Sequence, residues 1–204
     1  MRGALRFVIH RFDIVTVPER RDTAIALCRR YQPVFGRSAM ARAPDIHPEE
    51  GLPRVDSAHA EATSAIQQSL ERMVQAWNLG DAGLWAEAYW PTADSINILG
   101  GLMPDGLAIR DRHAEVFAGP FKGSHLAGNV RRIQWLGADV AIVDVDICVT
   151  KFRALPPGAS ATSPGVLQTR LKHIYQCRDG VWRIAASQNT AVVAGASPPP
   201  PFDK

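Results

Sequence analysis

The chain has 204 residues, of which 46% are hydrophobic and 21% charged, and its formal net charge is +3. This composition fits one globular domain with extensions, and it argues against a membrane-embedded chain because no apolar run approaches the ~20 residues of a spanning helix. Basic residues alternate with acidic ones, as in Glu19-Arg20-Arg21-Asp22, so no concentrated nucleic-acid-binding or membrane-binding face is indicated.

Three segments of the chain differ in composition. Residues 1–56 are rich in Arg and Pro without sustained periodicity, and we interpret them as a poorly ordered basic extension or a misassigned start. Charged residues interrupt each apolar run near Met1, so this segment does not resemble a secretory signal. Residues 194–204 hold consecutive prolines, which lack the amide protons that helices and strands require, and we expect them to be disordered. The folded domain is therefore expected over residues 57–193.

The first half of this domain is predicted to be mainly helical. A long helix is expected over Ala58–Leu79, whose apolar residues recur on one stripe: Ile66, Leu70, Met73, Val74 and Trp77. Gly80 ends this helix, and Asp81 caps a short second helix that reaches Tyr89 and ends before Pro91. A strand is predicted for Asp94–Leu99. A third helix, Leu107–Ala118, carries an apolar face that includes His113.

The second half is predicted to be four long strands. They are rich in β-branched and apolar residues and span Ser124–Trp135, Val140–Phe152, Val166–Cys177 and Val181–Thr190. Asp179-Gly180 between the last two is a hairpin turn, because these residues tolerate positive φ. Helices followed by an antiparallel meander indicate an α+β fold, with three N-terminal helices packed in a strongly curved antiparallel sheet.

One strand has apolar residues on both faces. The first face of the Val140 strand is wholly apolar, and the second is apolar with two acids set into it: Val140, Ile142, Asp144, Asp146 and Cys148. A sheet that is partly apolar on both sides is expected to be covered on both. We therefore predict a homodimer formed sheet to sheet.

The remaining motif search is negative. Cys28, Cys148 and Cys177 are odd in number, far apart and without CxxC spacing, which indicates neither a disulfide framework nor a zinc site. The chain lacks GxSxG, HExxH, P-loop and GxGxxG motifs, and its six histidines are dispersed. We expect no metal, no cofactor and a location in the reducing cytoplasm.

Several segments, in order, resemble the SgcJ/EcaC branch of the SnoaL-like group, in the nuclear transport factor 2-like superfamily. They are Trp77-Asn78-Leu79-Gly80-Asp81, Ile96-Asn97-Ile98-Leu99-Gly100, Ala108-Ile109-Arg110 through His113 to Ser124, Asp179-Gly180-Val181-Trp182-Arg183-Ile184, and Asn189-Thr190. The resemblance implies a cone of helices and curved sheet that encloses a pocket, like that of ketosteroid isomerases. Where that branch often has His-Asn-Thr, this chain has Gln188-Asn189-Thr190.

Candidate catalytic residues are those that the fold would turn into the cone. His113 shares the buried face of the third helix and could move a proton near neutral pH, or could be a hydrogen-bonded core residue. Asp146, beside Asp144, could be a carboxylate of raised pKa in the cavity, or could face solvent or a dimer mate. Asn97 and Asn189 could stabilise an oxyanion or satisfy backbone groups at strand ends.

Candidate substrate-binding residues are the aromatic Trp77, Tyr89 and Phe117, which could wall a cavity or belong to the core, together with Asp144 and Gln188. Two functions remain open. The domain is either a cofactor-independent isomerase, cyclase or hydrolase acting on a small hydrophobic ketone or polyketide-like molecule, or a ligand-binding or dimerisation module without turnover.

Overall fold

The computed structural model describes residues 54–195, with side chains from residue 59. Most of the predicted extension and nearly all of the predicted tail lie outside these residues. The first described element is α2, Arg54–Leu79, which therefore begins four residues earlier than predicted. Within the described residues, no helix is long and apolar enough to span a bilayer.

Two shorter helices follow the long one. Gly80 adopts φ +72° after α2, and Asp81 caps α3, Ala82–Ala86, because its Oδ1 accepts a hydrogen bond of 2.9 Å from the Leu84 amide. Asp105 caps α4, Gly106–Ala118, in the same way. These caps confirm the predicted starts of the second and third helices.

The sequence prediction was wrong at Tyr89, which lies in a strand and not at the end of the second helix. Strand β1 spans Tyr89–Ile96 and includes Pro91, and it is followed by the two-residue β2, Leu102–Met103. Burial explains the difference, since Tyr89, Ala93 and Ser95 are buried with exposed residues between them, the pattern of a strand with one covered face.

The remaining strands lie close to their predicted positions. They are β3, His125–Trp135; β4, Val140–Thr150; β5, Val166–Arg178; and β6, Val181–Ala191. Asp179 and Gly180 both have positive φ, at 50° and 77°, which confirms the predicted hairpin turn.

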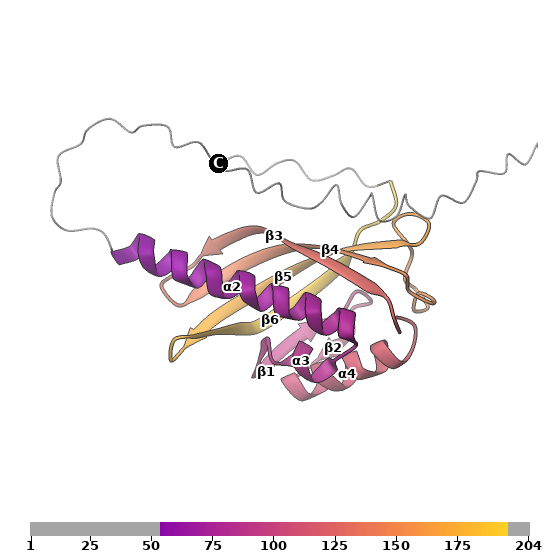
Figure 1. Cartoon of the computed structure of the whole chain (residues 1–204), viewed down its shortest axis with the longest axis horizontal. Helices are drawn as coiled ribbons and strands as arrows, with labels where there is room; N and C mark the ends of the chain where they lie inside the picture. The colour runs from indigo at the N-terminus through magenta and orange to yellow at the C-terminus, as the bar shows by residue number, and fades with distance from the viewer. Residues whose placement is uncertain (1–53, 196–204) are drawn as a thin grey trace, which may run out of the picture.

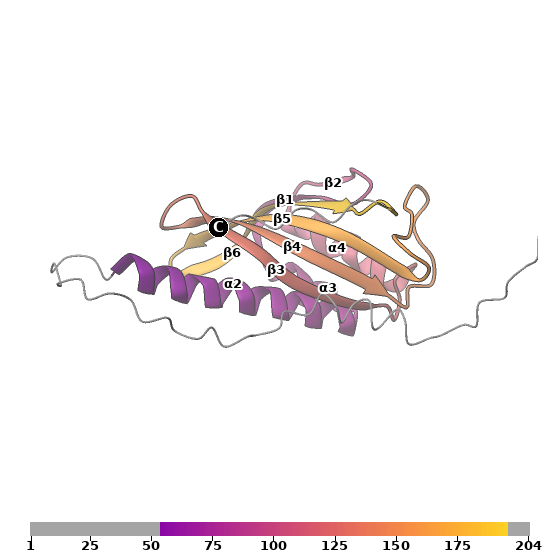
Figure 2. The same cartoon turned by 90° about the horizontal axis from the view of Figure 1, so that it is seen from above.

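The six strands form one curved sheet in the order β2-β1-β6-β5-β4-β3 (Figures 1 and 2). Strands β3 to β6 form the predicted antiparallel meander, whereas β1 pairs with β6 in parallel. The sheet is thus mixed, because β1 enters it from the helical half of the chain and lies beside its last strand. This α+β cone matches the predicted fold class.

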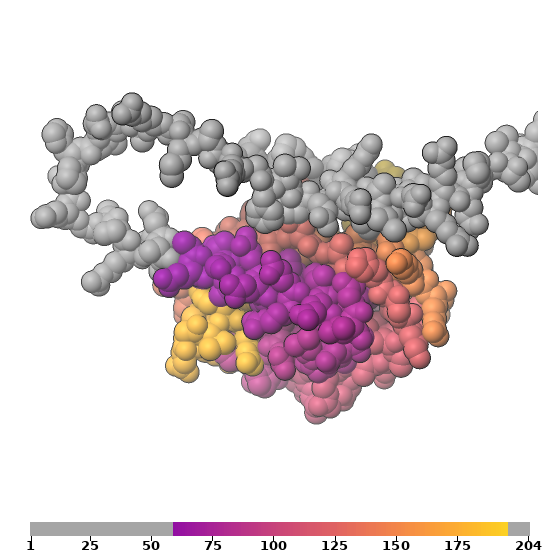
Figure 3. All heavy atoms as spheres, viewed as in Figure 1, coloured from indigo at the N-terminus to yellow at the C-terminus, as the bar shows by residue number. Residues whose placement is uncertain are grey.

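The core lies between the helices and one face of the sheet. Helix α2 packs on β3 and β6, and α4 packs on β1 and β2. From the side of α2, this helix and the segment after it cover much of the sheet (Figure 3). The inner face of β4 is at most 5% exposed along its length, as its apolar pattern predicts: Ala141, Val143, Val145, Ile147 and Val149.

Candidate functional site

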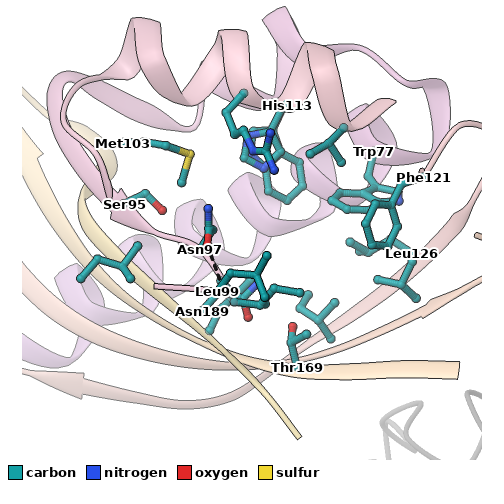
Figure 4. Close-up of a pocket in the computed structure, with 18 of the residues that line it drawn as sticks. Trp77, Ser95, Asn97, Leu99, Met103, His113, Phe121, Leu126, Thr169 and Asn189 are labelled. Carbon is teal, nitrogen blue, oxygen red and sulfur yellow. Dashed lines mark hydrogen bonds between the residues drawn. The ribbon is translucent and has the colours of Figure 1, made fainter. Parts of the chain in front are cut away.

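A cavity of about 110 Å³ lies between α4, the end of α2 and the inner face of the sheet (Figure 4). Its walls are mainly apolar and include Trp77, Met103, Phe121, Leu126 and Leu171. Apolar cavities of ~150 Å³ hold a benzene-sized molecule, so a single ring or a short chain is the scale of ligand that fits here. Among the described residues, no carboxylate lines this cavity.

His113 points from α4 into the roof of the cavity (Figure 4). Its Nδ1 lies 2.8 Å from the Ile109 carbonyl oxygen one turn earlier, and its ring stacks on Trp85 at 4.7 Å between centroids. Burial lowers the pKa of His113 to about 4, the hydrogen bond to Ile109 opposes this effect, and the charge of Arg112 adds to it. The imidazole is therefore neutral at pH 7.

Asn97 lies near the mouth of the cavity and has two functions in the structure. Its Oδ1 accepts hydrogen bonds from the amides of Leu99 and Gly101, at 2.8 and 3.0 Å, and so closes the turn between β1 and β2. Its Nδ2 is directed into the cavity (Figure 4). Asn97 thus satisfies backbone groups, one of the two roles considered from the sequence, and its Nδ2 can donate a hydrogen bond to a ligand.

The floor of the cavity carries two polar groups without a partner. Thr169 on β5 is 3% exposed, and neither its Oγ1 nor Asn189 Oδ1 on β6 has a hydrogen-bond partner. Leu171 pairs with Asn189 across the two strands, so Thr169 lies diagonally beside Asn189 on the same face. Asn189 was predicted as a site residue, and the structure places it at this floor.

A fully buried histidine lies next to the floor, on the same inner face of the sheet. His173 is next after Leu171 on the inner face of β5, is 0% exposed and has no partner for either ring nitrogen. Its ring approaches those of Tyr89 and Tyr175, with centroid separations of 6.4 and 6.0 Å. Burial lowers the pKa of His173 to about 4.

Of the three predicted aromatic residues, Trp77 and Tyr89 line the cavity and Phe117 does not. The Trp77 indole donates a 2.9 Å hydrogen bond to the Ser124 hydroxyl, which fixes its ring at the wall. Burial raises the pKa of Tyr89 far above its usual range, so its hydroxyl stays protonated. Phe117 instead packs edge-on against Trp77 at 5.2 Å, in the core behind that wall.

The prediction that Asp144 and Asp146 line the cavity is wrong. Alternate residues of β4 point inward, so these two side chains lie on the outer face of the sheet. Asp144 forms ion pairs with Arg132 and Lys172 from the flanking strands, and its pKa lies below the usual range because these cations outweigh the effect of burial. Asp146 likewise forms ion pairs with Arg131 and Arg170.

Gln188 is also outside the cavity. It is exposed, and together with Asp144 and Asp146 it lines a separate groove on the outer face of the sheet. Sequence reasoning missed two other inner residues, Thr169 and His173. The alternation of β5 could have found them, because Thr169, Leu171, His173 and Tyr175 occupy one face.

Among residues 54–195, no group of three or more His, Cys, Asp or Glu side chains could hold a metal ion. Cys177 is free, whereas Cys148 is disulfide-bonded. This bond corrects the expectation, drawn from the number and spacing of the cysteines, that the chain contains no disulfide.

Comparisons with solved structures identify the fold. A protein of unknown function with a cystatin-like fold from Nostoc punctiforme is 25% identical over 65% of this chain and 78% of its own, with a TM-score of 0.56. An NTF-2-like protein of unknown function from Shewanella oneidensis is 17% identical over 63% and 98%, with a TM-score of 0.52. The hexachlorocyclohexane dehydrochlorinase LinA-type3 from Novosphingobium barchaimii is 17% identical over 72% and 99%, with a TM-score of 0.56.

No protein-family model matches the chain, and no match is found among curated proteins. The structural likenesses show the cystatin-like, NTF-2-like cone. They confirm the α+β cone fold that the sequence segments indicated.

Proposed function

We propose that this NTF-2-like cone binds a small, largely apolar molecule in its cavity and that His113 transfers a proton to or from it. The observation that carries the proposal is the position of His113, an oriented neutral imidazole in the roof of a largely apolar cavity. Such a group is equipped for general acid–base chemistry once a substrate lies within hydrogen-bond reach.

The hydrogen bond to Ile109 sets the tautomer of this histidine. A carbonyl oxygen can only accept, so Nδ1 of His113 carries the proton of the neutral ring. The lone pair is then on Nε2, and a neutral imidazole with a free Nε2 acts as a base. With a pKa of about 4, nearly all molecules are in this form at pH 7.

Asn97 supplies a complementary group for this chemistry. A proton next to a carbonyl is acidified when a donor stabilises the negative charge that develops on the carbonyl oxygen. The Asn97 Nδ2, directed into the cavity, is such a donor. Together His113 and Asn97 suit enolisation of a small ketone, with His113 removing the proton and Asn97 stabilising the oxygen.

One structural neighbour supports this class of reaction. LinA-type3 is a hexachlorocyclohexane dehydrochlorinase, and dehydrochlorination removes a proton and a chloride from an apolar ring. At 17% identity the likeness extends to the fold, so the step is proposed here on the geometry around His113.

The test is exchange of α-protons for deuterium on a cyclic ketone in D2O, followed by NMR. We expect wild-type protein to accelerate exchange and His113→Gln to lower that rate by ~10²–10⁴-fold, the usual contribution of a general base. His125→Gln is the matched control, because His125 is exposed and lies outside the cavity. An equal rate in all three proteins rules out the catalytic role.

Binding without turnover is the second candidate, and the low pKa of His113 favours it. A base of pKa about 4 is weak, since proton transfer near pH 7 is most efficient for groups whose pKa is close to that pH. This function predicts that a ketone ligand raises the melting temperature in proportion to occupancy, with no exchange even after prolonged incubation.

We further propose a homodimer formed through the outer face of the sheet. Ile174 on the central strand β5 is 38% exposed there, and Val193 beyond β6 is 73% exposed. Burial of such side chains against a second copy would remove apolar surface from water. Sedimentation of wild type and Ile174→Arg tests this, with a dimer expected for the first and a monomer for the second.

A further inference from the structure

We propose that the ligand carries a hydroxyl group, which binds Thr169 and Asn189 on the floor of the cavity while its apolar body lies below His113. The inference rests on the proposed function and names the chemical class of its ligand. It also makes Thr169 a specificity-determining residue.

Several buried polar side chains at or near the cavity lack a hydrogen-bond partner. Six buried side-chain atoms in the described part of the chain have no partner, and they belong to five residues: Trp85, Thr169, His173, Ser187 and Asn189. Trp85, Thr169 and Asn189 line the cavity. His173 and Ser187 are paired across β5 and β6 and are buried next to this floor, further along the two strands. Native proteins rarely leave such atoms unpaired, and their gathering around one cavity points to a polar occupant.

The fold places two of these groups where one ligand atom can reach both. Thr169 and Asn189 lie on adjacent antiparallel strands and on the same face, one diagonal step apart across Leu171. Figure 4 shows the Thr169 hydroxyl and the Asn189 side chain on the sheet side of the cavity, with His113 on the opposite, helical side. A ligand between them would contact Thr169 and Asn189 at one end and His113 at the other.

The chemistry of these atoms selects the polar group of the ligand. Asn189 Oδ1 can only accept a hydrogen bond, so the ligand must donate one. The Thr169 hydroxyl can donate as well as accept. A ligand hydroxyl therefore satisfies both, whereas an ether or an isolated ketone oxygen leaves Asn189 Oδ1 unpaired.

The volume and lining of the cavity indicate that the rest of the ligand is apolar. A volume of about 110 Å³ is on the scale of one six-membered ring. The walls above the floor are aromatic and aliphatic, from Trp77, Phe121 and Leu126 among others. The ligand class is thus a small six-membered ring that carries a hydroxyl group, together with a ketone where His113 is to remove an α-proton.

Phenol and benzene are the probes that test this inference, because they differ by one hydroxyl. We expect wild-type protein to bind phenol about tenfold more tightly than benzene in NMR titrations, the effect of about 1.4 kcal/mol from hydrogen bonding. Thr169→Val keeps the side-chain shape and should remove most of this preference without weakening benzene binding. Asn189→Leu is an independent second variant with the same expected loss.

Thr150→Val is the matched control, because Thr150 is also a buried strand threonine, at 5% exposure, but lies outside the cavity. It should keep the preference for phenol. Benzene binding without a preference for phenol in wild type would overturn the inference and leave the apolar cavity of the proposed function intact. A preference that survives both Thr169→Val and Asn189→Leu would also overturn it. Failure of both probes to bind would reject the proposed function as well.

Discussion

His173 should make the protein sensitive to acid, and replacing it with leucine should remove most of that sensitivity. The imidazole is 0% exposed, and both of its nitrogens lack partners. Protonation would place a charge in the core beside the rings of Tyr89 and Tyr175, with no acid near enough to neutralise it among the contacts of the ring. The folded state therefore resists protonation at His173.

The magnitude follows from the two pKa values. The folded-state pKa of His173 is about 4, and an exposed histidine in the unfolded chain has a pKa of 6.5. Between these values the unfolded state binds more protons, so the free energy of unfolding decreases as the pH falls. The stabilisation of the folded state by the neutral His173 is therefore fully present above pH 6.5 and is lost by about pH 4. A difference of about 2.5 pKa units corresponds to about 3 kcal/mol.

Urea unfolding at a series of pH values from 7 to 4 measures this effect. His173→Leu should lose about 3 kcal/mol less than wild type over that range, since leucine has a similar volume and no titrating group. At pH 7 the variant should be at least as stable, because two unpartnered nitrogens are removed. His113 contributes a loss of the same sign that remains in the variant.

Thr150→Val serves as the control, because it alters a buried strand side chain, at 5% exposure, without removing a titratable group, and it should leave the pH dependence unchanged. The reasoning is refuted if His173→Leu and wild type lose the same free energy between pH 7 and pH 4. It is also refuted if the variant is several kcal/mol less stable at pH 7, since His173 would then form favourable contacts in the folded state.

Three further changes test individual contacts by chemical unfolding. Asp105→Ala removes the 2.7 Å hydrogen bond from the Ala108 amide to the cap of α4 and should cost ~1 kcal/mol, whereas Asp105→Asn should cost less. Asn78→Ala removes two hydrogen bonds to the Leu126 backbone, of 2.8 and 3.1 Å, and should cost ~1–3 kcal/mol; no loss would show that water replaces them. Asp144→Asn should cost ~1–2 kcal/mol at pH 7 and progressively less as acidic pH protonates the carboxylate; a cost independent of pH would contradict the ion-pair assignment.

The local patterns of the chain were sufficient for most of the fold. Capping residues such as Asp81, the Asp179-Gly180 turn and the strand alternation each depend on neighbours close in sequence. The exception was Tyr89, which looked like the end of a helix. Its place in β1 depends on pairing with β6, about a hundred residues later in the chain.

The candidate site was less accessible to sequence reasoning, because alternation reveals two faces of a strand without saying which one meets the cavity. Asp144 and Asp146 were assigned to the wrong face for this reason. The structure assigns the wholly apolar face of β4 to the interior and gives both acids cross-strand cations. His113 and Asn189 were placed correctly because the first lies on a buried helix face and the second on the inner face of the last strand.

The sequence by itself determined most of the elements, their order and the α+β class, since hydrophobic periodicity, caps and turns act over a few residues, and the family resemblance implied the cone. Only the tertiary structure decided which polar groups converge. Thr169 on β5, Asn189 on β6 and His113 on α4 are distant along the chain, and strand register and helix packing bring them around one cavity. That convergence depends on non-local pairing, for which a single sequence carries no direct signal.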